Sequence, residues 1–164
     1  MAPFLSVVIP AYNEAPRLPQ SLDAVLAFLK QQSYDSEILV SDDGSQDRTV
    51  ALAEEKLAGF PHRILTTPRN RGKGHAVRQG MLAATGQYIL FTDADLSTPI
   101  TEVSRFLDYL RTDCDVAIGS RALPDSQIEI HQNFLREMMG KTFNLIAQRW
   151  AFKGIRDSQC GFKC

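Results

Sequence analysis

The chain has 164 residues, of which 18 are Lys or Arg and 19 are Asp or Glu, and its formal net charge is −1 at pH 7. This length suits a single domain with a core of its own, and the balanced charge gives no basic surface of the kind that bulk nucleic-acid binding needs, so we expect no nucleic-acid partner. The three cysteines have no paired C-x-x-C spacing, which disfavours a disulfide framework or a zinc site and favours reduced thiols in a cytoplasmic setting.

Apolar periodicity predicts strands that alternate with helices. Short continuous apolar runs are typical of strands buried on both faces of a parallel sheet, and apolar residues at three- and four-residue spacing are typical of helices. In chain order the pattern predicts strand 5–9, helix 18–29, strand 37–41, helix 49–57, strand 63–66, helix 74–84, strand 88–92, helix 103–110 and strand 116–119. Because alternation at this spacing indicates right-handed βαβ units, we expect an α/β fold with a mostly parallel central sheet and helices on both faces.

Polar clusters follow four of the predicted strands, at residues 10–14, 41–45, 93–95 and 119–121. Each cluster by itself is explained by an ordinary turn. In open parallel sheets, however, the carboxyl ends of the strands lie at one edge, and ligands bind there. The joint placement therefore predicts one binding rim formed by all four clusters.

Asp93 and Asp95 stand where a buried strand meets solvent, with only Ala94 between them. Their hard oxygen ligands could share one divalent cation, or one carboxylate could bind it through water. Acidic pairs are common in loops by chance, so the position of the pair counts for more than the pair itself. We predict a Mg²⁺ or Mn²⁺ site at these two carboxylates.

The basic loop 69–75 places Lys73 between Gly72 and Gly74, where backbone and ammonium can both approach phosphate. It is not a Walker A loop, because Gly74 follows the lysine where Ser or Thr is required. It is not a dinucleotide fingerprint either, because Val77 stands where a glycine is needed. A solvated basic loop is the alternative explanation.

Five segments together resemble the inverting glycosyltransferases that use nucleotide-diphosphate sugars: V-V-I-P-A-Y-N-E at 7–14, S-D-D-G-S at 41–45, R-N-R-G-K-G-H-A at 69–76, T-D-A-D at 92–95 and G-S-R at 119–121. Residues 154–163 are similar to a segment of the dolichyl-phosphate β-glucosyltransferases. The resemblance implies a Rossmann-like domain of the GT-A type that transfers glucose from UDP-glucose to a polyprenyl or dolichyl phosphate. Mannosyl transfer from GDP-mannose is the alternative, which Ser97-Thr98-Pro99 disfavours because the related mannosyltransferases often carry an amide or imidazole there.

The resemblance also implies roles for particular residues. Asp95, assisted by Asp93, would bind the metal, and Asp43 would accept a hydrogen bond from the uracil imino group. Asp157 would position the sugar or the acceptor, unless it only pairs with Arg156. A lipid phosphate is already largely anionic near neutral pH, so the reaction needs no strong general base. The expected nucleotide-sugar residues are Pro10, Ala11, Tyr12, Glu14, Asp42, Asp43, Lys73, Asp93, Ala94 and Asp95, and the expected acceptor-phosphate residues are Arg121 and Arg136, whose guanidinium forks suit phosphate.

Family members continue beyond the motif at 154–163, so we expect residues 1–164 to be one glycosyltransferase domain cut short at its C-terminal end. It could then bind nucleotide without turnover. The apolar stripe in 134–152, with basic residues between, predicts peripheral membrane contact at the cytosolic face or else a core-facing helix. A receiver-type phospho-acceptor module would carry acidic residues after the first strand, and a nucleotidylyltransferase would carry a Gly- and Arg-rich loop there; residues 10–14 fit neither.

Overall fold

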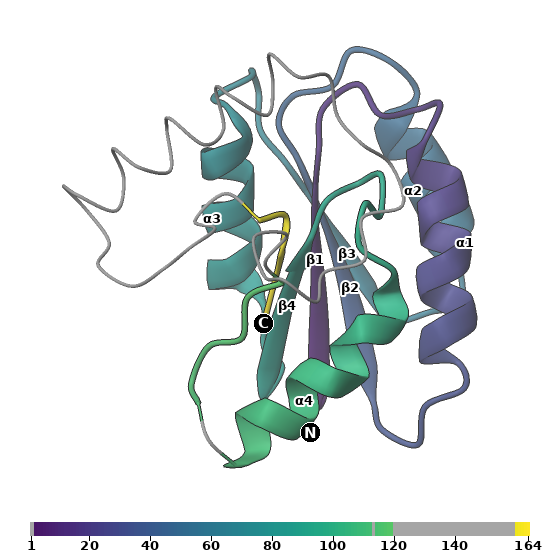
Figure 1. The fold of residues 1–164 in the computed structure, drawn as a ribbon. Helices are drawn as coiled ribbons and strands as arrows, with labels where there is room; N and C mark the ends of the chain where they lie inside the picture. Colours follow the sequence, from purple (N-terminus) through teal and green to yellow (C-terminus); the bar gives the residue numbers. More distant parts are fainter. Residues whose placement is uncertain (1, 113, 120–159) are drawn as a thin grey trace, which may run out of the picture. The chain divides into compact units, whose positions relative to one another are not determined.

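The computed structural model describes residues 2–112, 114–119 and 160–164. Met1–Ala117 and Gly161–Cys164 form one compact unit, and Ile118–Cys160 form a second unit that lies largely outside the described residues. Figure 1 shows the elements of the first unit, and their order confirms the predicted alternation. They are β1 (Leu5–Ala11), α1 (Leu18–Leu29), β2 (Ser36–Asp42), α2 (Thr49–Leu57), β3 (His62–Thr66), α3 (Lys73–Ala83), β4 (Tyr88–Thr92), the 3₁₀ turn η1 (Ile100–Glu102), α4 (Val103–Thr112) and β5 (Phe162–Lys163).

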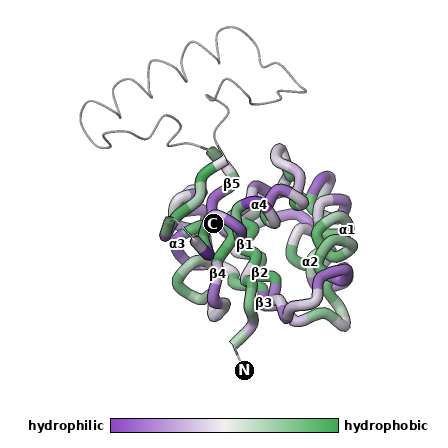
Figure 2. Tube along the Cα trace, turned by 60° about the horizontal axis from the view of Figure 1, so that its bottom comes forward, coloured by the Kyte–Doolittle hydropathy of each residue, from purple (hydrophilic) through white to green (hydrophobic). Residues whose placement is uncertain are grey.

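The strands form one mainly parallel sheet in the order β3-β2-β1-β4-β5. β1 lies between β2 and β4 and runs parallel to both, while β2 and β3 are also parallel. All seven residues of β1 are buried, as expected for a central strand with both faces covered. Figures 1 and 2 show α3 on one face of the sheet and α1 and α2 on the other, and the central strands are apolar along their length. The predicted fold class is therefore confirmed.

The last strand of the sheet differs from the prediction. Residues 116–119 were expected to add a parallel strand, but the edge strand is β5, which pairs antiparallel with β4. Ala117 only exchanges two backbone hydrogen bonds with Cys164, at 2.8 and 3.0 Å. The reason is burial: Phe162 is fully buried and its ring lies 5.2 Å from that of Phe106, whereas Val116 is 62% exposed. The pairing of β5 with β4 places Gly161, which precedes β5, next to Asp93 at the end of β4.

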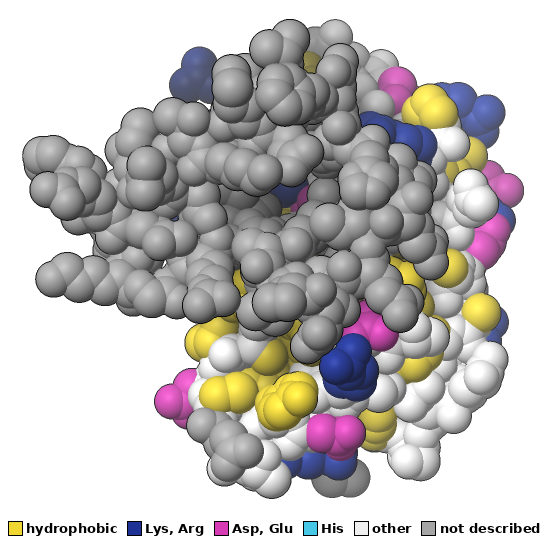
Figure 3. Space-filling view, in the orientation of Figure 1, with side chains coloured by type: hydrophobic (Ala, Val, Ile, Leu, Met, Phe, Trp, Pro, Cys, Tyr) yellow, Lys and Arg dark blue, Asp and Glu magenta, His cyan; other side chains and the backbone are white. Residues whose placement is uncertain are grey.

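Acidic and basic side chains are interspersed on the described part of the face shown in Figure 3, in line with the balanced composition. Among the helices of the described residues, none has both the length and the apolar character needed to cross a membrane.

The buried carboxylate of Glu37 lies near the start of β2, at the end of the sheet opposite the predicted rim. It connects β1, β3 and the segment before β4 through hydrogen bonds. It accepts hydrogen bonds from the Ser6 hydroxyl at 2.6 Å, from the Thr85 amide and hydroxyl at 2.9 and 2.8 Å, and from the Arg63 guanidinium at 2.9 Å. Burial raises the pKa of Glu37, but the hydrogen bonds from Ser6, Thr85 and Arg63 outweigh burial and lower it. The ionised carboxylate therefore stabilises the fold.

Glu37→Gln should lower the free energy of unfolding at pH 7 by about 1.5–3 kcal/mol, the range for hydrogen bonds to a charged group. Because the folded pKa of Glu37 lies below its ordinary value of 4.5, its contribution is present above that value and is lost as pH falls through the folded pKa. Urea unfolding at pH 7 and at lower pH should show the two proteins converge in acid. Glu55→Gln, at an exposed position of α2, is the control, and an equal loss there would contradict this role.

Candidate functional site

The carboxyl ends of β1, β2 and β4 meet at one edge of the sheet, as predicted. In the parallel register Ala11 lies beside Asp42, and the Asp43 amide donates to the Ala11 carbonyl at 2.9 Å. Three of the four predicted clusters are thereby brought together. Only Gly119 of the fourth cluster is among the described residues.

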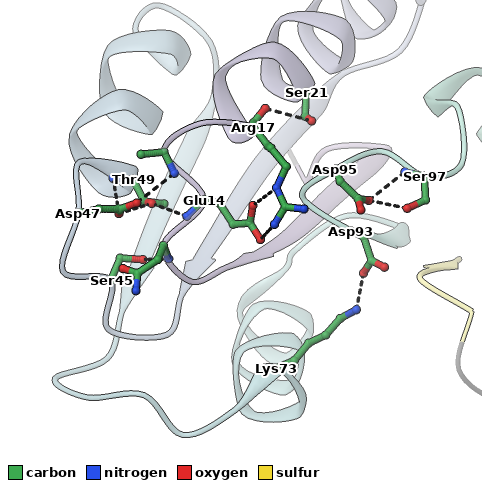
Figure 4. A network of polar contacts seen from close by, with 12 residues as sticks. Glu14, Arg17, Ser21, Ser45, Asp47, Thr49, Lys73, Asp93, Asp95 and Ser97 are labelled. Atoms are coloured by element: carbon green, nitrogen blue, oxygen red, sulfur yellow. Dashed lines mark hydrogen bonds and ion pairs between the residues drawn. The ribbon is translucent and has the colours of Figure 1, made fainter. Parts of the chain in front are cut away.

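The loops that follow β1 and β2 are tied together by side chains that bind backbone (Figure 4). The backbone amide of Asn13 donates to the Ser45 hydroxyl at 2.8 Å, and the backbone amide of Glu14 donates to the Thr49 hydroxyl at 2.8 Å. The Asp47 carboxylate accepts from the Thr49 backbone amide at 2.9 Å, in the turn that leads into α2. The side-chain oxygen of Asn13 accepts a hydrogen bond from the backbone amide of Gln46 at 2.9 Å. This network fixes Tyr12 and Glu14 next to the loop that follows β2.

The predicted nucleotide residues on β1 contribute in different ways. Pro10 and Ala11 are buried in the strand, so neither side chain is open to solvent. The Tyr12 side chain is 41% exposed at the mouth of the site. The Glu14 carboxylate is engaged by Arg17 through two bonds of 2.8 and 2.7 Å, so it is not a free acceptor.

A cavity of about 350 Å³ opens between the two loops and the end of β3, lined in part by Tyr12, Asp42, Ser45, Gln46, Thr67 and Asn70. Asp42 is 2% exposed, and its Oδ2 accepts from the Gly44 and Ser45 amides at 3.1 and 3.0 Å. Its buried Oδ1 has no hydrogen-bond partner within the described part of the chain. Residues 66–68 were not expected here, whereas residues 69 and 70 begin the predicted basic loop. The signal that could have found residues 66–68 is their position at the carboxyl end of β3.

Asp43, the predicted uracil reader, is 1% exposed and holds the loop between β3 and α3. The backbone amide of Arg71 lies 3.0 Å from each carboxylate oxygen of Asp43 and donates to both. The backbone amide of Gly72 donates to Oδ2 at 2.6 Å, and the Thr67 hydroxyl donates to Oδ1 at 3.4 Å. A contact between Asp43 and a base stays a prediction. In this structure its oxygens are committed to the loop that presents Lys73.

The two carboxylates of the acidic motif lie at the end of β4, and Figure 4 shows them with Lys73. Asp93 Oδ1 lies 2.7 Å from the Lys73 ammonium, and the Asp93 amide donates to the Gly161 carbonyl at 3.0 Å. A β-carbon at Gly161 would collide with the Asp93 carboxylate as it lies here, so another residue at this position would require that carboxylate to move. Gly161 was part of the recognised motif, but its contact with Asp93 was not foreseen.

Asp95 is exposed, and its Oδ1 accepts from the Ser97 amide and hydroxyl at 3.0 and 2.6 Å. Burial raises the pKa of Asp95, but the bonds from Ser97 and the nearby Arg17 charge lower it overall. Leu96, between Asp95 and Ser97, has a left-handed backbone with a φ of 47°. This conformation is costly for a leucine and often marks a functional turn. Ala94, between the two carboxylates in the sequence, is buried.

These carboxylates fit a divalent cation. Their donors are hard oxygens, and a positive charge, the Lys73 ammonium, already rests against Asp93. Among residues 2–112, 114–119 and 160–164, no group of three or more His, Cys, Asp or Glu side chains is placed to hold a metal. That donor set is typical of Mg²⁺ sites in which one or two carboxylates act together with substrate phosphates and water.

The remaining predicted residues, Asp157, Arg121 and Arg136, lie outside the described residues, as does the apolar stripe at 134–152. The described residues therefore include the predicted nucleotide-sugar residues but none of the predicted acceptor residues.

The profile of glycosyl transferase family 2 matches residues 6–163. The chain belongs to this family. The dolichyl-phosphate β-glucosyltransferase of Drosophila melanogaster is 41% identical over 173 positions, which cover 97% of this chain and 53% of that protein. The resemblance recognised from the motifs is confirmed, and the chain spans about half the length of the curated relatives it matches.

Two solved structures add to this. A mannosyltransferase of Pyrobaculum calidifontis in complex with GDP-Man and Mn²⁺ is 27% identical and has a TM-score of 0.58, over 69% of this chain and 34% of that one. Glucosyl-3-phosphoglycerate synthase of Mycobacterium tuberculosis, in complex with Mn²⁺, UDP and glucosyl-3-phosphoglycerate, is 21% identical and has a TM-score of 0.66, over 98% of this chain and 56% of that one. The second likeness concerns the fold alone. The GT-A type of fold is confirmed.

Proposed function

We propose that this domain binds UDP-glucose together with a divalent cation and that its full-length protein transfers the glucose, with inversion, to a polyprenyl or dolichyl phosphate. The observation that carries the proposal is the meeting of the cavity, the Lys73 loop and the two motif carboxylates at one edge of the sheet. The names of the family 2 relatives support glucose and a dolichyl phosphate. The Mn²⁺ complexes of similar folds support a metal.

The nucleoside would enter the cavity beside Tyr12. Asp42 Oδ1 in its wall has no hydrogen-bond partner among the described residues and is a candidate acceptor for a base or ribose donor, because a buried oxygen without a partner gains from a new hydrogen bond. Asp93 and Asp95 would hold the cation at the diphosphate. When bound, that cation neutralises charge on the departing UDP. Lys73 adds a further positive charge from the opposite loop.

An oxygen of the acceptor phosphate would attack the anomeric carbon, forming a new C–O bond while the bond to the β-phosphate oxygen of UDP breaks. In-line attack inverts the configuration. The acceptor oxygen is already anionic, so no side chain of this domain needs to remove a proton. We keep Arg121 and Arg136 as the proposed acceptor-phosphate residues and Asp157 as the proposed positioning residue, with the lipid acceptor at the cytosolic face of a membrane.

The donor is the part of the proposal that this chain can test directly. A ligand that binds the folded state raises the melting temperature, and at equal concentration the tighter ligand raises it more. Since we propose UDP-glucose as the donor, UDP-glucose with Mg²⁺ should raise the melting temperature more than GDP-mannose with Mg²⁺. The Ser97 hydroxyl and amide are both bound to Asp95, so Ser97 offers no free donor to select mannose. Isothermal titration of UDP and GDP provides the matched comparison. Tighter GDP binding would replace the proposal with the mannosyl alternative.

A further inference from the structure

Lys73 occupies an unusual place for a basic residue. It is the first residue of α3, where the positive end of the helix dipole disfavours a cation. Its ammonium nevertheless points back to Asp93 Oδ1 at 2.7 Å and lies 5.7 Å from the centre of the Phe91 ring. The side chain is 59% exposed, so the contact is accessible to exchange. The Asp93 carboxylate is thus the partner that holds the ammonium in this position.

The backbone of Asp93 is held at the end of β4, next to Gly161. Its amide is bound to the Gly161 carbonyl, and its carboxylate lies against Gly161 so closely that a β-carbon would not fit. A cation bound to the same carboxylate would therefore lie close to the Lys73 ammonium, and the two like charges would repel each other. Binding of metal and retention of the Lys73 contact are in competition.

Lys73 can leave without disturbing the fold. It stands between Gly72, whose φ is 95°, and Gly74, and no neighbouring atom lies within 4 Å of a β-carbon placed at either glycine. The loop on its N-terminal side is held separately, through the bonds from the Arg71 and Gly72 amides to Asp43. A side-chain rotation is enough to move the ammonium from Asp93 toward an anion on the same rim.

We propose that Lys73 is an exchangeable counter-ion: it neutralises Asp93 in the donor-free domain, yields that carboxylate to the divalent cation and then pairs with the diphosphate. This inference rests on the proposed function and adds a consequence to it. Metal alone binds weakly because it must displace the ammonium, whereas metal and nucleotide together bind with positive coupling, since the displaced ammonium gains the phosphate as a partner.

The test is the affinity for Mn²⁺ alone, measured by electron paramagnetic resonance titration of the intact chain without nucleotide. Lys73→Gln should bind Mn²⁺ about two- to fivefold more tightly than wild type, the range that corresponds to an exposed ion pair. In the presence of Mn²⁺ the same variant should bind UDP several-fold more weakly. Lys73→Arg keeps the positive charge and should retain the weak Mn²⁺ binding of wild type.

Lys56→Gln is the matched control, because it breaks another ion pair of 2.7 Å, to Asp23, and should change neither affinity. Thermal unfolding of each variant verifies that it is folded. Equal or weaker Mn²⁺ binding in Lys73→Gln overturns the counter-ion role, while stabilisation of wild type by UDP-glucose would leave the proposed function standing. Absence of Mn²⁺ binding from both wild type and Lys73→Gln, together with no response to UDP-glucose, overturns both.

Discussion

Asp95→Asn should lower kcat/KM for sugar transfer by about 10²–10³-fold in the full-length enzyme, the scale seen when one group that stabilises developing charge is removed. The amide keeps the size of the side chain but loses the negative charge that the metal requires. Asp95 is exposed at the end of β4, so the charge contributes little to the core. The fold and its melting temperature should be nearly unchanged.

The measurement is turnover with a short polyprenyl phosphate as a function of Mg²⁺ concentration, alongside Mn²⁺ titration of the same variant. Asp108→Asn, on an exposed position of α4, is the matched control and should behave as wild type. Asp93→Asn should also impair transfer, and it should in addition release Lys73 from its ion pair. Unchanged turnover of Asp95→Asn at limiting Mg²⁺ would falsify the metal assignment.

Asp43→Ala should have the second large effect, on both the fold and the donor site. Three hydrogen bonds from the Arg71 and Gly72 amides end on this buried carboxylate. Their loss leaves backbone donors unpaired, so we expect the free energy of unfolding to fall by about 1.5–3 kcal/mol. UDP binding should weaken as well, because the loop that lines the cavity and presents Lys73 loses its anchor.

Trypsin provides a direct measurement of the loop, since Arg69 and Arg71 are exposed within it. Cleavage after these arginines should be faster in Asp43→Ala than in wild type, and urea unfolding should show the lower stability. Asp108→Ala serves as the control for both measurements. Wild-type cleavage and stability combined with weak UDP binding would contradict the anchoring role and favour a direct contact between Asp43 and the base.

Local patterns in the sequence were enough to predict the alternation of elements. The helix expected at 18–29 coincides with α1, and the strand expected at 88–92 coincides with β4. This succeeded because burial imposes a period of its own on each element, continuous in a doubly covered strand and near 3.6 residues in a helix. The rim followed from the same reasoning, because parallel strands must bring their carboxyl ends together. The family followed from motifs at those ends, and its profile matches residues 6–163.

Only the tertiary structure decided how the rim side chains are used. Asp43 was predicted to face a base, yet its oxygens bind the Arg71 and Gly72 amides of a loop that comes much later in the chain. The partner at the edge of β4 is β5, because Phe162 is buried against α4 and Val116 is not. Asp93 pairs with Lys73 and lies against Gly161, two residues far from it in the sequence. Such contacts join residues distant in sequence, and hydrophobic periodicity within one segment carries no information about which distant segment will pack against it.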